Sequence, residues 1–119
     1  ITGIIMSSST ADIYNPKVIR STMGSIYRVP FVIVADLPKA VDILREDGIT
    51  CFAAHLKGEL YNSGTLTKDC ALLIGNEANG LSDEVANKAD KLIKIPMAGK
   101  VESLNAAIAT SILMYEATR

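Results

Sequence analysis

Short apolar segments alternate along this chain with segments whose apolar residues recur at helical spacing. Strands that are separated by helices are joined by crossover connections, which place them parallel to one another. This order therefore predicts an α/β domain with a mostly parallel sheet and flanking helices. The predicted strands are Gly3–Met6, Phe31–Val34, Ile49–Ala54, Ala71–Ile74 and Lys91–Ile95.

Helix start and stop signals lie between these strands. Asn15-Pro16 fits an N-cap followed by proline at the first helical position. Asp36–Pro38 opens a second helix, which Gly48 is expected to close as a C-cap. Ser82 is expected to start a short third helix. The polar segment 57–69 has no clear period and is predicted to be a loop.

The last predicted helix runs from about Leu104 to Ala117, with Ser103 as its N-cap and Asn105 in its first turn. Replacing Asn105 by Ala should cost such a helix little, because Ala is the better helix former. A helix that is apolar on nearly all sides is buried, or half-buried in a partner subunit. One apolar stripe of this helix comprises Leu104, Ala107, Ile108, Ser111, Ile112 and Tyr115.

Length and composition exclude several classes of protein. The 119 residues fit a single domain, and a net charge of -1 does not indicate a charge-driven nucleic-acid binder. Cys51 and Cys70 form no CxxC pair, and one His cannot complete a typical zinc site, so no metal is predicted. The thiols fit buried cysteines in a reducing cytoplasm. No apolar run reaches the roughly 18–20 residues of a membrane span.

Two glycine-containing loops follow predicted strands. GNEANG, Gly75 to Gly80, comes directly after a buried strand and before a helix, which is where α/β domains build ligand sites. Gly75 would let a ligand approach the backbone, and Gly80 would permit a positive φ. An ordinary strand-to-helix turn is an equally good interpretation of this segment.

The second loop lies in IPMAGKVESLNAA, Ile95 to Ala107, and leads to the N-terminus of the last helix. Free N–H groups there favour an anionic or carbonyl group, although helix capping alone would also explain the pattern. Since both loops follow strands, they are expected to face one crevice. His55, the only histidine, follows a third strand and is either a ligand contact or a simple loop residue.

At these loops the sequence resembles SpoU-type RNA methyltransferases of the SPOUT superfamily. The segments LLIGNEANGLSDEV and IKIPMAGKVESLNAAIATSILMYE are similar to that family's second and third motifs, and NPKVIRSTMGSIYRVPF to the segment before them. The resemblance implies a C-terminal segment threaded into a deep trefoil knot. It also implies S-adenosylmethionine as methyl donor, the 2′-hydroxyl of rRNA or tRNA as acceptor, and a homodimer formed through the C-terminal helix.

The resemblance assigns roles to individual residues as well. Polar positions near the reacting groups match Glu77, Ser103 and Asn105. Positions that hold the donor match Gly75, Asn76, Ile95, Met97 and Leu104. Ser103 and Asn105 would orient the ribose, and the apolar side chains would sandwich the adenine.

One part of the family pattern is missing. The first motif, Asn-x-Gly followed by a catalytic Arg, has no match, because the segment from Asn15 to Arg20 lacks the glycine and its Arg falls one place too early. The chain therefore reads as a single domain, 1–119, cut from a longer protein without its first motif and any RNA-binding extension. Two further interpretations stay open: a non-catalytic donor-binding and dimerisation module, and a generic nucleotide-binding domain.

Overall fold

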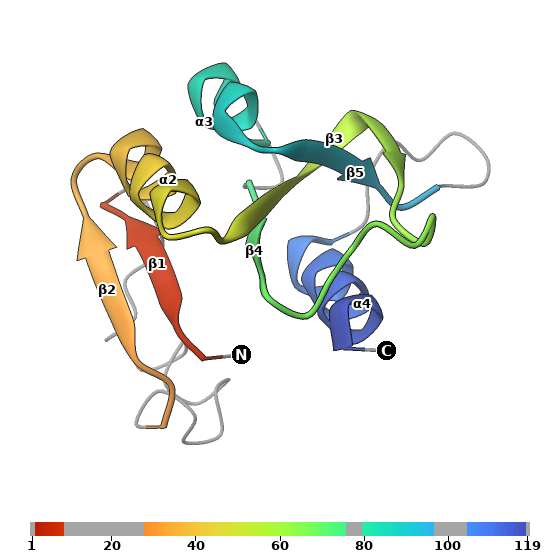
Figure 1. Ribbon diagram of the computed structural model, residues 1–119, viewed down its shortest axis with the longest axis horizontal. Coiled ribbons are helices and arrows are strands. Elements are labelled where there is room, and N and C mark those ends of the chain that lie inside the picture. The colour runs from red at the N-terminus through yellow and green to blue at the C-terminus, as the bar shows by residue number, and fades with distance from the viewer. Residues whose placement is uncertain (1, 9–27, 76–79, 97–104, 119) are drawn as a thin grey trace. The chain divides into compact units, whose positions relative to one another are not determined.

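The structure is a computed structural model that describes residues 2–8, 28–75, 80–96 and 105–118. Contacts within the chain divide it into two units, Ile1–Leu37 and Pro38–Arg119. The helix predicted to start at Asn15 lies outside the described residues. The described elements are β1 (Ile4–Ser7), β2 (Phe31–Val34), α2 (Leu37–Glu46), β3 (Thr50–Leu60), β4 (Cys70–Leu73), α3 (Asp83–Lys88), β5 (Lys91–Lys94) and α4 (Ala106–Thr118) (Figure 1).

The first unit contains a parallel pair of strands. β1 pairs with β2 from Ile4 opposite Phe31 to Ser7 opposite Val34. The N–H of Ile4 also donates to the Pro30 carbonyl at 2.9 Å, which fixes the register where the strands begin. Both strands were predicted from their apolar runs, and both predictions are confirmed.

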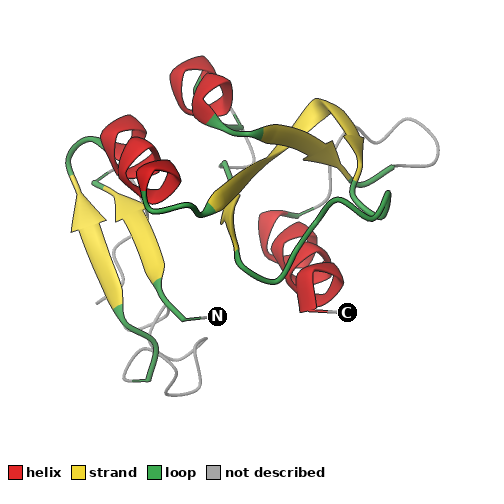
Figure 2. Cartoon of the chain, in the orientation of Figure 1, coloured by secondary structure: helices red, strands yellow, loops and turns green. Residues whose placement is uncertain are grey.

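The second unit is built on a three-stranded sheet in the order β4-β3-β5. β3 pairs in parallel with both neighbours, as the alternation of strands and helices predicts (Figure 2). α4 lies on one side of this sheet and α3 on the other (Figure 1). None of the described helices is long and apolar enough to cross a membrane.

The core of the second unit lies between the sheet and α4. Phe52 of β3 and Ile93 of β5 are buried against Leu113 and Ala117 of α4, and Leu66 closes the cluster. Removing a side chain of this size from water contributes about 1.5–3 kcal/mol. Because Phe52 is only 2% exposed and lies on the central strand, it ties the sheet to the helix.

Asp90 joins the amino ends of β3 and β5. Its Oδ2 accepts the Cys51 N–H at 2.7 Å, and its own N–H donates to the Cys51 carbonyl at 2.8 Å. Its Oδ1 accepts from Arg45 Nε of α2 at 3.1 Å. A second ion pair, from Lys88 of α3 to Asp42 of α2 at 2.8 Å, links the two helices. The carboxylate thus holds two strand starts and a helix end together.

Two of the predicted end signals are confirmed by backbone geometry. Gly48 follows α2 with a φ of 81°, and its N–H donates to the Arg45 carbonyl at 3.0 Å. Ser82 is the N-cap of α3, where its hydroxyl accepts the Val85 N–H at 3.3 Å. Gly48 therefore ends α2 as a C-cap, and Ser82 begins α3 as an N-cap, as their residue types predicted.

β3 is longer than the sequence predicted. A strand was expected over Ile49–Ala54 and a loop over 57–69, whereas β3 extends to Leu60. It pairs with β5 as far as Ala54, leaves the ladder, and returns with Glu59 opposite the same residue, Ile93. Residues 55–58 interrupt the alternation of side chains between the two faces of the strand. The sequence pattern therefore does not reveal that β3 pairs with β5 a second time.

We expect Gly58→Ala to destabilise the second unit strongly. A Cβ at this position would lie 2.5 Å from the Ile93 nitrogen and 2.5 Å from the Leu92 carbonyl carbon, both of them backbone atoms. Such overpacking costs about 1–3 kcal/mol, which urea unfolding followed by circular dichroism would measure.

Gly3→Ala is the matched control for this prediction. Its new Cβ would meet only the Pro30 carbonyl, at an ordinary 3.6 Å. The control should leave the urea midpoint close to that of the wild type. Equal midpoints for the Gly58 and Gly3 variants would contradict the close approach of β3 to β5.

Candidate functional site

The two candidate loops leave the sheet at the same edge. Gly75 follows β4 and Ile95 follows β5, and both strands run parallel to β3, which lies between them. Parallel strands place their carboxyl ends together, and two inter-strand spacings separate the loop starts by about 10 Å. This is the edge at which open α/β sheets bind ligands. The geometry therefore supports the expected common crevice.

Gly75, which follows β4, lies directly against the chain where it returns at Gly80. A Cβ on Gly75 would overlap the backbone of Gly80 and Leu81, and Gly80 has a φ of 64°. The positive φ of Gly80 was predicted and is confirmed. The space beside Gly75 was expected to admit a ligand, but the chain's own returning backbone occupies it. A side chain therefore has no room at Gly75, and the positive φ favours glycine at position 80.

Two isoleucines form an apolar edge beside these loops. Ile95, a predicted donor contact, is half-buried and packs against the cluster around Phe52 and Ile93. Ile74, just before Gly75, is half-buried against the same cluster and was missed by the sequence analysis. The alternation of Cys70, Leu72 and Ile74 toward one face of β4 is the signal that could have identified it.

Asn105 caps α4. Its Oδ1 accepts the N–H groups of Ala107 at 2.9 Å and Ile108 at 3.4 Å, and its carbonyl accepts the Ala109 N–H at 2.9 Å. The helix therefore begins at Ala106, and the predicted N-cap at Ser103 with Asn105 in the first turn is wrong. Asn and Ser are both good caps, so residue type alone could not choose between them.

This cap changes what the start of α4 can do. Two of the N–H groups that were expected to face an anion are already satisfied by Asn105. Capping uses only the side-chain oxygen, so the amide Nδ2 keeps its two donor hydrogens. Asn105 is exposed, and this nitrogen is the atom through which it could reach a ligand.

The structure places three of the eight predicted site residues. Gly75 and Ile95 lie at one sheet edge, and Asn105 begins α4. The other five lie outside the described residues: Asn76, Glu77, Met97, Ser103 and Leu104.

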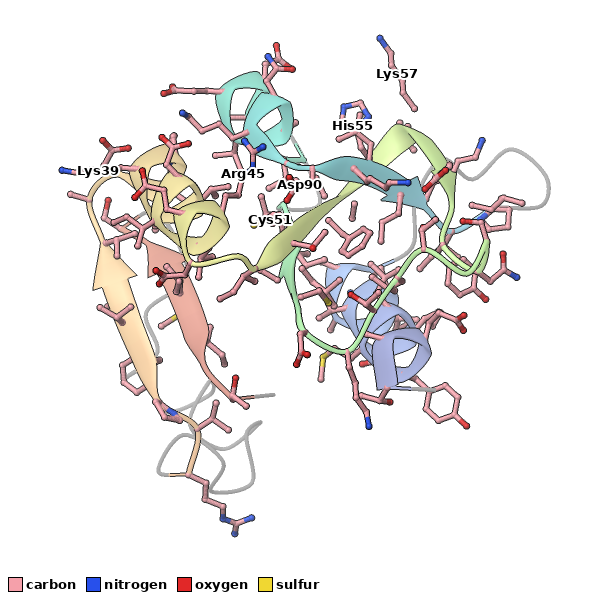
Figure 3. The ribbon with its side chains drawn as sticks, viewed as in Figure 1. Lys39, Arg45, Cys51, His55, Lys57 and Asp90 are labelled. Carbon is pink, nitrogen blue, oxygen red and sulfur yellow. The ribbon has the colours of Figure 1, made fainter. Side chains whose placement is uncertain are left out.

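His55 belongs to β3 and is half-buried. Its Nδ1 accepts the N–H of Lys57 at 3.1 Å, which leaves Nε2 as the ring atom that can donate. Both side chains lie on the face of the sheet opposite α4 (Figure 3). Among the described residues, no group of three or more His, Cys, Asp or Glu side chains could hold a metal ion.

Both cysteines are free thiols. Cys51 is buried and Cys70 is half-buried. Burial raises the pKa of each thiol, and the neighbouring carboxylates Asp90 and Asp69 raise it further, whereas Arg45 opposes the effect at Cys51. A raised pKa leaves little of the reactive thiolate at neutral pH. The expectation of unreactive, buried thiols therefore agrees with their surroundings.

Comparison with known proteins gives one consistent result. The model of the SpoU rRNA Methylase family matches residues 1–115. The chain is 34% identical over 114 residues to the 23S rRNA (guanosine(2553)-2′-O)-methyltransferase RlmP of Bacillus subtilis. The alignment covers 95% of this chain and 46% of that protein. The chain spans about half the length of the curated relatives it matches.

Solved structures agree with the sequence comparison. The crystal structure of the SpoU methyltransferase AviRb from Streptomyces viridochromogenes, in complex with the cofactor AdoMet, matches with a TM-score of 0.87 and 35% identity. That match covers 97% of this chain and 48% of AviRb. An AdoMet-bound rRNA methyltransferase from Sinorhizobium meliloti matches with a TM-score of 0.84 and 36% identity over 98% of this chain and 45% of that one. The likeness supports the parallel α/β fold.

The small cost expected from the sequence for Asn105→Ala is corrected by the cap: we expect this change to lower the free energy of unfolding by about 1 kcal/mol, because two N–H groups of α4 lose their acceptor. Asn105→Asp keeps that acceptor and should stay close to the wild type. Urea midpoints of the three proteins measure the difference.

Ser111→Ala provides the control, since it introduces Ala on the exposed side of the same helix. It should be neutral or slightly stabilising. If Asn105→Ala proved equally neutral, Asn105 would not be the cap.

Proposed function

The chain belongs to the SpoU rRNA methylase family, and we propose that it binds S-adenosylmethionine and transfers the methyl group to an RNA ribose 2′-hydroxyl. The supporting observation is the common edge at which Gly75 and Ile95 follow parallel strands. Two matched structures with AdoMet bound, and a relative named for 2′-O-methylation of rRNA, support the choice of donor and acceptor. An rRNA or tRNA substrate would place the protein in the cytoplasm.

The residues at this edge fit an adenosine-containing donor. Backbone N–H and C=O groups at the carboxyl end of β4 would read the edge of an adenine. The half-buried side chains of Ile74 and Ile95 provide an apolar wall of the kind that a base needs. We assign donor binding to five residues: Gly75, Asn76, Ile95, Met97 and Leu104.

The rate of the proposed reaction depends more on the alignment of the reacting atoms than on acid–base catalysis. The bound donor supplies an electrophilic methyl group on a sulfonium sulfur. As the 2′-oxygen bonds to the methyl carbon, the carbon–sulfur bond breaks, its electron pair stays on sulfur, and the hydroxyl proton leaves. In-line alignment gives most of the acceleration, and help with the proton adds about 10²–10⁴-fold.

Three polar residues are assigned to the ribose in this proposal: Glu77, Ser103 and Asn105. Asn105 has the best-defined geometry, since its oxygen is held by the first turn of α4. The cap fixes the amide plane, so Nδ2 can donate to a ribose oxygen from a fixed direction. Ser103 would orient the ribose together with Asn105, and the Glu77 carboxylate would hold the ribose and could accept the departing proton.

We further propose that residues 1–119 form one SpoU-like domain with a trefoil knot at its C-terminal end. The matched family and the parallel fold support this assignment. The knot would be formed by the connection between β5 and α4, which is the segment that also carries Met97, Ser103 and Leu104.

The exposed face of α4 fits an interface with a second copy of the chain. Leu113 and Ala117 face the core, whereas Ile108 and Tyr115 are 54% and 72% exposed. Most of the stripe predicted from Leu104 to Tyr115 is thus the outward side of the helix. A large apolar side chain on a surface helix indicates a partner when others lie on the same stripe.

We expect the chain to be a dimer that Ile108→Glu combined with Tyr115→Glu converts to a monomer. The charges would be buried without partners in the interface. Sedimentation velocity measures the change. Ile43→Glu on α2 is the control, since Ile43 is 50% exposed but lies on another helix. A monomeric wild type would contradict the dimer.

The function itself is tested by incubating the chain with labelled S-adenosylmethionine and total rRNA or tRNA. Mass spectrometry of the digested nucleosides should reveal a 2′-O-methylated product. Gly75→Ala should abolish it, because the new Cβ would overlap the backbone of Gly80 and distort the turn. Gly3→Ala, whose Cβ meets only an ordinary contact, should retain it.

Calorimetric titration with S-adenosylhomocysteine separates the remaining alternatives. Binding near one ligand per chain without methyl transfer would support a donor-binding and dimerisation module in place of an enzyme. Binding of ATP in competition with the donor would support a generic nucleotide-binding domain. A folded chain that binds neither ligand would contradict the proposed function.

A further inference from the structure

Among the described elements, no helix covers the carboxyl-end part of the β3–β5 face opposite α4 (Figure 1). Side chains alternate between the two faces of a strand. Phe52 and Ile93 point toward α4, so their neighbours Cys51, Ala53 and Lys94 belong to the opposite face. Cys51 and Ala53 are fully buried near the strand starts, whereas Lys94 near the carboxyl end is exposed.

The bulge in β3 adds residues to this uncovered part. Leu60 pairs with Lys94, so it lies on the same face as Lys94, and it is 45% exposed. His55 and Lys57 lie on the same side of the sheet (Figure 3). We call this the β3–β5 surface and define it by four residues: His55, Lys57, Leu60 and Lys94.

The charge of the β3–β5 surface is positive. Among the residues that the structure describes, neither Lys57 nor Lys94 forms an ion pair. The nearby carboxylate of Glu59 is paired with Lys91 at 3.6 Å. The Nδ1 atom of His55 accepts from the Lys57 backbone, so its Nε2–H can donate outward.

The rest of the described second unit carries the opposite charge. α2, α3 and the turn between α2 and β3 hold more carboxylates than cations, in a chain whose net charge is -1. The carboxylates are Asp42, Glu46, Asp47, Asp83 and Glu84. Among the described residues of the second unit, the β3–β5 surface is therefore a positive region beside acidic elements, and such a region steers an anionic partner toward it.

The position of the surface points to the partner. Lys94 directly precedes Ile95, so the surface lies at the edge that the proposed function gives to the methyl donor. A methylated nucleotide must reach that edge, and its flanking phosphates must lie beside it. Lysine side chains contact phosphates without reading sequence, and apolar side chains can pack against unstacked bases.

We propose that the β3–β5 surface binds the phosphate backbone of RNA beside the nucleotide that is methylated. The proposal rests on the proposed function, because that function places the acceptor ribose at this edge. Lys57 and Lys94 contact phosphates, His55 donates from Nε2, and Leu60 packs against a base. The surface positions RNA and is not itself catalytic.

Fluorescence anisotropy with a short, mixed-sequence, fluorescein-labelled RNA tests this surface across a series of salt concentrations. Lys57→Glu and Lys94→Glu should each weaken binding about 5- to 10-fold and lower the slope of log K against log salt by about one. Lys68→Glu makes the same charge change just before β4, at the amino edge of the sheet, and should change neither quantity.

Titration of the same variants with S-adenosylhomocysteine keeps the two proposals separate. All variants should bind it as the wild type does. If the wild type did not bind RNA, or if all variants bound it equally well, the proposed RNA-binding role of the β3–β5 surface would be refuted. An acidic protein would then be the partner that fits the positive charge of this surface. RNA binding could be lost only in the Lys57 and Lys94 variants while no protein in the series binds S-adenosylhomocysteine. That result would support RNA binding by the β3–β5 surface and refute the methyl-transfer function.

Discussion

The parallel pairing of β3 with both β4 and β5 is the constraint on which the rest of the second unit depends. Because β3 is the central strand, its residue Phe52 lies at the centre of the core that packs against α4. The same pairing makes β4 and β5 run in the same direction. Two loops that are far apart in sequence then begin at one edge. Asp90 fixes the other edge by holding the starts of β3 and β5. The positions of the two loop starts are therefore set by backbone pairing between strands.

Several residues at that edge hold the structure and are also assigned to the function. Gly75 lies directly against the backbone of Gly80 and Leu81, and it is also assigned to the donor. The side-chain oxygen of Asn105 caps α4, which leaves its nitrogen for a ligand. Loss of activity on mutation would not by itself distinguish these roles. Stability and ligand binding have to be measured on the same variants.

The sequence predicted those parts of the fold whose signals are local. Apolar runs located every described strand, and the chemistry of Gly48, Ser82 and Gly80 marked ends and turns that the backbone confirms. The extension of β3 was missed because it depends on hydrogen bonds to β5 and not on side-chain alternation. The cap of α4 was misplaced because Ser103 and Asn105 are both good caps. The roles of the site residues came from family resemblance, since charge and spacing alone also fit an ordinary turn.

The central claim is that the carboxyl ends of β4 and β5 form the donor site. Amide chemical shifts of the labelled chain during titration with S-adenosylhomocysteine test this most directly. The largest changes are predicted at Gly75, Gly80, Ile95 and Asn105, while Gly48 and Lys68 at the amino edge should not move. Saturable binding whose changes instead centred on Gly48 and Lys68, with Gly75 and Ile95 unmoved, would contradict the account.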